Sequence, residues 1–312
     1  MDLENKLTLV FLSNKPTLLD IQLEYLDRLN IKLASRILFA AFNYNKQTNI
    51  KNVGGDIENG FERFKLAVES IDTEYCKICA DDDLFIAHEI GPQLRILDNN
   101  PDIVNIMGLS LSYNSERNVG IPESLRPSYN SENPGTRICQ LLLNYGHFFY
   151  GIYRTKVLKA ALEIFLKETT APLGNNVVEL GLALLTCLSG KCSVYPSITL
   201  IREPTASESW YNDLIILNQA ENLKTLFLSI LQLLHHQNKC PLELMNINDF
   251  HFWFRQYLMK DLSCVDEKYK NIIQANGFQS KFAGRAYNIE KQDAFYLNKI
   301  CEQKKVILNA QK

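Results

Sequence analysis

Residues 74–83 have the sequence Glu-Tyr-Cys-Lys-Ile-Cys-Ala-Asp-Asp-Asp, a mostly apolar run that ends in three consecutive aspartates. The run has the length of a buried strand, and the carboxylates follow it directly. Adjacent carboxylates repel one another, which favours a bound counter-charge. Because Mg²⁺ and Mn²⁺ prefer carboxylate and phosphate oxygens, Asp81, Asp82 and Asp83 are predicted to bind one of these metals. A solvated turn is the alternative, since turns are rich in aspartate.

The segments before this run alternate between buried strands and amphipathic helices. Such alternation is typical of a parallel sheet with crossover helices. Ligands of such sheets bind at the carboxyl ends of the strands, which is where the aspartates lie. The predicted segments are a strand at 7–14, a helix at 16–30, a strand at 36–43, a polar loop at 44–55, a helix at 56–72 and the strand at 74–80.

The later segments continue the pattern and then become helical. The sequence predicts an α/β fold with a mostly parallel sheet and a helical C-terminal region, divided into residues 1–210 and 211–312, with the second part packed on the first. The predicted segments are a helix at 87–97, a strand at 102–113, a polar loop or lid at 113–137, a glycine-broken strand at 147–154, helices at 155–168 and 177–190, a strand pair with a proline turn at 191–204, and helices at 213–237 and over much of 247–310.

Charge and composition limit the partners. The chain has 312 residues with 33 basic and 35 acidic side chains, so no basic excess is present to hold a nucleic acid. The first residues lack the apolar run of a secretory signal, and residues 223–234 are too few and too polar to span a bilayer. The eight scattered cysteines are typical of free thiols. We therefore expect a cytoplasmic protein and leave open both peripheral association with the inner face of the membrane and the oligomeric state.

The aspartate motif and its surroundings resemble the GT-A glycosyltransferases, in particular bacterial glycosyltransferase family 2. The resemblance covers about residues 5–210. The stretches that carry it are the turn Leu12-Ser13-Asn14, the Glu74–Asp83 motif, Asn100-Pro101-Asp102-Ile103-Val104, and Tyr150-Gly151-Ile152-Tyr153-Arg154.

A second hallmark of this family is an acidic residue that opens a helix eleven positions before a glycine, followed by a strand that contains a proline. Gly190 and Pro196 match it, which places the acidic residue at Glu179. The resemblance implies that Glu179 is the catalytic base of an inverting transferase. The alternative is a first-turn acid favoured by the helix dipole. The sequence departs from the family in having Val178-Glu179 where Glu-Asp is frequent.

The resemblance also implies a set of donor-binding residues. Ser13 and Asn14 follow the first strand, and Asn43 stands after the second strand, where the family often has an acid. Lys15, Arg63 and Lys65 are candidate cations for the phosphates of the donor. Arg202 follows the last strand, in the region that closes over the donor and the acceptor in the family. Asp81 is assigned both to the ribose and to the metal, because the triad can be aligned with the family in two registers.

These residues together imply a glycosyltransferase. It would use Mn²⁺ or Mg²⁺ to move a sugar from a nucleotide-diphosphate-sugar donor to a hydroxyl of a glycan or a lipid-linked glycan. Two alternatives stay open. One is a nucleotidyltransferase, although the turn after the first strand lacks the expected Gly-rich loop. The other is a catalytically degenerate transferase that serves as a binding or scaffold module.

Overall fold

The computed structural model describes residues 6–30, 35–40, 44, 50–53, 57, 59–114, 119–122, 128–144, 148–168, 175–202, 220–241 and 291–310. Their centre is one sheet of nine strands, in the order β3-β2-β1-β4-β8-β6-β9-β5, with β7 paired to β6. The strands are β1 (Leu7–Ser13), β2 (Ser35–Ala40), β3 (Ile50–Val53), β4 (Tyr75–Ala80), β5 (Leu84–Phe85), β6 (Ile103–Asn114), β7 (Val119–Pro122), β8 (Ile152–Arg154) and β9 (Lys191–Arg202).

The core strands of this sheet share one direction. β3, β2, β1 and β4 are parallel neighbours, and β6 is parallel to β9. β8 is antiparallel to both β4 and β6, so β6 and β9 point the same way as β4. The carboxyl ends of these parallel strands therefore lie at one edge of the sheet. The predicted α/β class with a mostly parallel core is confirmed.

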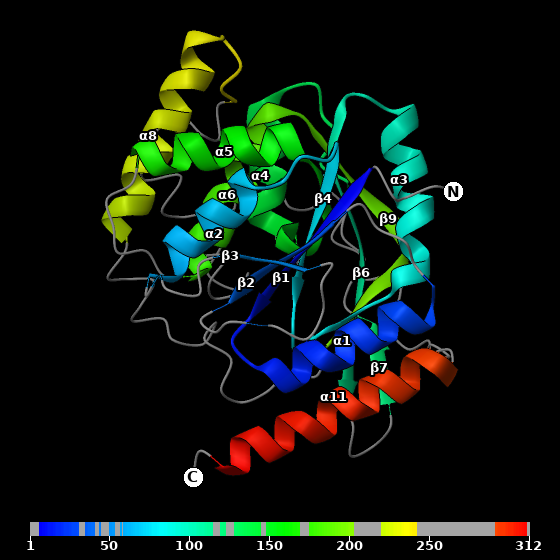
Figure 1. Ribbon diagram of the computed structural model, residues 1–312. Helices are drawn as coiled ribbons and strands as arrows, with labels where there is room; N and C mark the ends of the chain where they lie inside the picture. Colours follow the sequence, from blue (N-terminus) through cyan, green and yellow to red (C-terminus); the bar gives the residue numbers. More distant parts are fainter. Residues whose placement is uncertain are drawn as a thin grey trace.

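Helices cover the two faces of the sheet (Figure 1). α1, α3 and α11 pack on one face, and α2, α4, α5, α6 and α8 on the other, as their two separate apolar cores show. The helices are α1 (Pro16–Arg28), α2 (Gly60–Glu69), α3 (Ile90–Asn99), α4 (Pro134–Asn144), α5 (Thr155–Glu168), α6 (Asn175–Ser189), α8 (Ala220–His236) and α11 (Lys291–Ala310), with short 3₁₀ turns at Ala87–Glu89 and Phe148–Tyr150.

The two described C-terminal helices lie on opposite faces. α8 buries Leu226, Phe227 and Ile230 in the core that contains α5 and α6, whereas α11 packs along α1. Figure 1 shows α11 running beside α1, far from α8. Within the described ranges, no helix is both long and apolar enough to cross a membrane.

Three local predictions were wrong. The polar stretch 44–55 contains β3, which joins the sheet edge beside β2. The polar stretch 113–137 contains β7, and α4 begins at Pro134. Residues 191–202 form one strand rather than a pair of strands. The pairing of this strand with β6 is irregular around Pro196, and the irregularity accommodates a residue without an N–H, so the strand continues past the proline.

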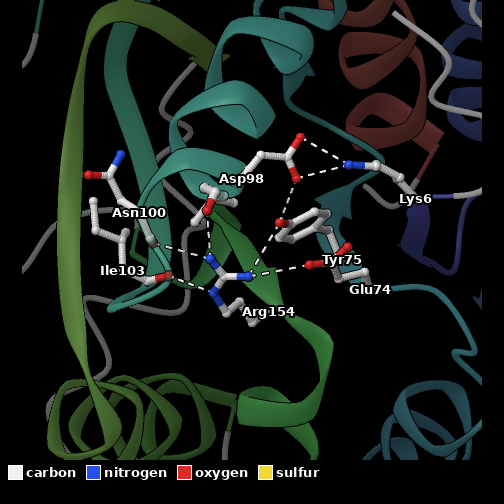
Figure 2. A network of polar contacts seen from close by, with 8 residues as sticks. Lys6, Glu74, Tyr75, Asp98, Asn100, Ile103 and Arg154 are labelled. Carbon is white, nitrogen blue, oxygen red and sulfur yellow. Dashed lines mark hydrogen bonds and ion pairs between the residues drawn. The ribbon is translucent and has the colours of Figure 1, made fainter.

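A buried arginine joins the start of β4 to the end of α3 (Figure 2). Arg154, at the end of β8, donates to the carbonyl oxygens of Leu97 at 2.6 Å and Ile103 at 2.9 Å, and its guanidinium lies 5.5 Å from the centre of the Tyr75 ring. The Tyr75 hydroxyl donates to Asp98, which also pairs with Lys6 at 3.0 Å. This network caps the carboxyl end of α3 and fixes the amino end of the strand that leads to the aspartates.

Replacing this arginine is expected to destabilise the fold. Arg154→Met keeps the aliphatic part of the side chain but removes the guanidinium donors from the carbonyl oxygens of Leu97 and Ile103, so we expect a loss of roughly 2–4 kcal/mol in the free energy of unfolding. Urea denaturation measures the loss. Lys156→Met is the matched control, because Lys156 is exposed two residues further on. Equal stability of the two variants would contradict a role for the network.

Candidate functional site

The parallel pairing of β1 and β4 brings the first aspartate beside the end of the first strand. Leu12 pairs with Ala80, so Ser13 and Asp81, the next residues, lie side by side. The Ser13 hydroxyl donates to the Asp81 carboxylate at 2.6 Å. Burial raises the pKa of Asp81 to about 6, while Ser13 and the nearby charge of Lys15 oppose that shift.

The pairing of β5 with β9 brings the third aspartate beside the end of the last strand. Leu84 pairs with Ile201 in antiparallel register, so Asp83 lies opposite Arg202. The Nε of Arg202 is 3.8 Å from the Asp83 carboxylate, and the Asp83 side chain is buried. The predicted donor-site residue Arg202 therefore lies against the aspartate motif.

A buried glutamine of α1 fixes the turn that carries the aspartates. The Nε2 of Gln22 donates to the carbonyl oxygens of Asp83 at 2.5 Å and Asp81 at 3.3 Å. Gln22 lies fully buried on the same helix face as Leu19 and Leu26. Sequence reasoning missed this residue, although a polar side chain on the apolar stripe of an amphipathic helix is the signal that could have found it.

Glu179 reaches the same site from the other face of the sheet. It lies in α6 beyond the first turn, which contains no acidic residue. The alternative of a first-turn acid favoured by the helix dipole therefore does not apply, and Glu179 also differs from the family hallmark of an acid that opens the helix. The residue keeps some exposure, but its carboxyl is surrounded by protein atoms. Burial raises its pKa to about 8, with Arg202 lowering it and Asp83 raising it further. Glu179 is therefore within electrostatic range of both partners.

The Tyr150 ring lies among these charges. Burial raises the pKa of its hydroxyl well above the usual value, and Glu179 and Asp83 add to the shift. Its backbone carbonyl accepts a hydrogen bond from the ammonium of Lys77, a buried lysine of β4. Tyr150 is therefore a neutral side chain within electrostatic range of the acidic residues.

The second aspartate is paired by a residue from the C-terminal helix. The Nζ of Lys304 in α11 is 3.9 Å from the Asp82 carboxylate. Lys304 is buried, whereas the Asp82 side chain is 37% exposed and is the most accessible of the three. No feature of the sequence linked residue 304 to the motif, because it lies far outside the stretch that resembles a known family.

The remaining predicted donor-binding residues are Asn14, Lys65 and Asn43. Asn14 is exposed, and its backbone N–H donates to Asp81. Lys65 lies on α2, and within the described residues it makes no hydrogen bond or ion pair with the aspartates. Asn43 lies outside the described residues. The donor-binding assignments stay predictions for all six residues: Ser13, Asn14, Asn43, Lys65, Asp81 and Arg202.

The chemistry of the aspartates is compatible with a hard divalent cation. Mg²⁺ is usually held by only one or two protein carboxylates together with substrate phosphates, and Asp82 offers a partly exposed carboxylate beside that of Asp83. Within the described ranges, however, no group of three or more His, Cys, Asp or Glu side chains is arranged to hold a metal by itself. Binding of Mn²⁺ or Mg²⁺ at Asp81, Asp82 and Asp83 stays a prediction.

Comparison with known proteins identifies likenesses among solved structures. No family model and no curated protein matches the chain. TarS residues 1–349 from S. aureus has a TM-score of 0.48 and 13% identity, over 96% of this chain and 91% of that one. Its complex with UDP-GlcNAc has a TM-score of 0.45 over the same shares. The bifunctional IspDF from Campylobacter jejuni has a TM-score of 0.35 and 13% identity, over 62% of this chain and 50% of that one. At these identities the likenesses do not define a family for the chain.

The raised pKa of Glu179 predicts a pH dependence of stability. The unfolded chain releases this proton near the ordinary value of 4.5 and the folded chain only near 8. Between these pH values the folded chain binds the extra proton, so the free energy of unfolding falls as pH rises and levels off above about 8. Glu179→Gln is expected to flatten this decline in urea denaturation from pH 5 to 8.5. Glu163→Gln, at an exposed position of α5, is expected to leave it unchanged. An unaltered slope in Glu179→Gln would refute the buried setting of this carboxyl.

Proposed function

We propose that this protein is a glycosyltransferase that transfers a sugar from a nucleotide-diphosphate-sugar to a hydroxyl group, with inversion at the anomeric carbon. The observation that carries the proposal is the convergence of a buried acid, Glu179, with Asp83 and Arg202 at the carboxyl edge of a parallel sheet. Such an edge is where α/β folds bind nucleotides. The likeness to a structure solved with UDP-GlcNAc is in keeping with the proposal and does not carry it.

Glu179 has the properties of a general base for this reaction. A base works best when its pKa is close to the working pH, and burial raises that of Glu179 to about 8. In the proposed reaction its carboxylate takes the proton of the acceptor hydroxyl as the oxygen attacks the anomeric carbon. Arg202, which favours the ionised form of Glu179, also offers a positive charge to the departing diphosphate.

The aspartates have the complementary role of holding the donor. Ser13 and Gln22 fix the Asp81 carboxylate and the backbone of the turn, so the carboxylates do not need to reorganise when the donor binds. Asp82 and Asp83 would hold Mn²⁺ or Mg²⁺. When bound, this metal would stabilise negative charge on the diphosphate. The acceptor in this proposal is a glycan or lipid-linked glycan, and peripheral membrane association goes with the lipid-linked case.

A substitution of Glu179 is expected to lower turnover and to leave the affinity for the donor unchanged. Isothermal titration with UDP-, GDP-, ADP-, CDP- and dTDP-sugars, with and without Mn²⁺, is expected to find a nucleotide-sugar that binds and depends on metal. Glu179→Gln is expected to keep that affinity and to lower donor turnover by roughly 10²–10⁴-fold. Glu163→Gln is the matched control, with unchanged turnover.

Three kinds of result would contradict the proposal. Absence of binding by every nucleotide-sugar would exclude a transferase of this class. Binding without any turnover by the wild type would favour the non-enzymatic alternative, a binding or scaffold module, and turnover that Glu179→Gln leaves unchanged would exclude Glu179 as the base. Release of pyrophosphate from a nucleoside triphosphate would favour the nucleotidyltransferase alternative.

The pH profile provides an independent check of the base. Because Glu179 must be ionised to accept a proton, kcat/KM is expected to rise with pH up to about 8 and then to level off. Initial rates between pH 5.5 and 9.5 at fixed metal concentration measure the profile. A rate that is flat across this range, or that falls between pH 6 and 8, is inconsistent with Glu179 as the base.

A further inference from the structure

The C-terminal helix α11 places a lysine where its own pattern calls for an apolar residue. Leu297, Ile300 and Cys301 form the buried stripe of this helix, each at most 2% exposed. Lys304 continues the stripe one turn later and is only 7% exposed, whereas the adjacent Lys305 is exposed. A lysine on a buried helix face is costly unless its charge is compensated. One compensating group is the carboxylate of Asp82, 3.9 Å away.

The position of this lysine is fixed by the docking of α11 on α1. The Tyr25 hydroxyl donates to the buried Asp293 at 2.7 Å and accepts a hydrogen bond from the backbone of Ala87, just after the aspartate turn. Lys299 pairs with Glu24 at 3.0 Å. These contacts join α11 to the same helix whose Gln22 holds the carbonyl oxygens of the aspartate turn. The helix is therefore anchored along its length beside the site.

The partners of the three aspartates come from separate parts of the fold. Asp81 is paired with Ser13 of β1, Asp83 with Arg202 of β9 and Asp82 with Lys304 of α11. Asp82 is the most exposed of the three, and the ammonium of Lys304 lies beside its carboxylate. The guanidinium of Arg202 lies beside the next aspartate, Asp83.

We propose that Lys304 is a phosphate-binding residue, so that α11 completes the donor site and contacts the diphosphate of the nucleotide-sugar. This inference rests on the proposed function and adds to it a binding group from a region outside the nucleotide-binding sheet. On binding, the ammonium of Lys304 exchanges its long contact with Asp82 for a charged hydrogen bond to a phosphate oxygen.

The test compares nucleoside diphosphate with nucleoside. Isothermal titration uses the tightest-binding of UDP, GDP, CDP, ADP and dTDP, together with its nucleoside, in the presence of Mn²⁺. Lys304→Gln is expected to weaken diphosphate binding about 10-fold and to leave nucleoside binding unchanged. Lys304→Arg is expected to recover most of the loss. Lys305→Gln removes the same charge from the exposed face of α11 and is expected to behave like the wild type.

The ratio of the two affinities keeps the test valid if Lys304→Gln is less stable, because partial unfolding lowers both affinities alike. An unchanged ratio in Lys304→Gln, with the wild type binding diphosphate, overturns the role of Lys304 but leaves the proposed function intact. Tighter Mn²⁺ binding in Lys304→Gln with unchanged diphosphate binding overturns it too, since the lysine would then be a competing counter-ion. If the wild type binds no diphosphate, the proposed function itself fails.

Discussion

The compensation of three adjacent negative charges at the end of a buried strand is the constraint on which the arrangement of the site depends. Asp81, Asp82 and Asp83 follow β4 directly, so three like charges meet at the sheet edge, and Asp81 and Asp83 are also buried. The fold meets this constraint with a partner for each side chain. These partners come from β1, β9 and α11, which lie far apart in the sequence.

The parallel direction of the core strands makes this compensation geometrically simple. Because β1, β4 and β9 point the same way, their carboxyl ends meet at one edge, and the register alone places Ser13 beside Asp81. The antiparallel pairing of β5 with β9 does the same for Asp83 and Arg202. Farther back, Arg154 fixes the start of β4 and the end of α3. The site therefore rests on backbone pairing rather than on long flexible side chains.

The proposed chemistry depends on the contrast between two carboxyl groups that interact with Arg202, those of Asp83 and Glu179. Asp83 lies 3.8 Å from the guanidinium, whereas the Glu179 carboxyl is buried and its pKa is raised to about 8. In the proposed reaction, Asp83 binds a positively charged group and Glu179 accepts a proton. Such a separation of roles between neighbouring acids is typical of catalytic sites that work near neutral pH.

The sequence by itself determined the α/β class and the strand that leads to the aspartates, because these features follow from local periodicity and short motifs. Glu179 became the candidate base only through the resemblance to a known family. The sequence did not predict β3, nor that β9 is one continuous strand, because short edge strands and proline-containing strands carry weak local signals. Only the tertiary structure identified Gln22 and Lys304, whose roles arise from contacts between helices and a turn distant in the sequence. A buried polar side chain gains its partner only when the chain has packed, so its role is decided by the packing.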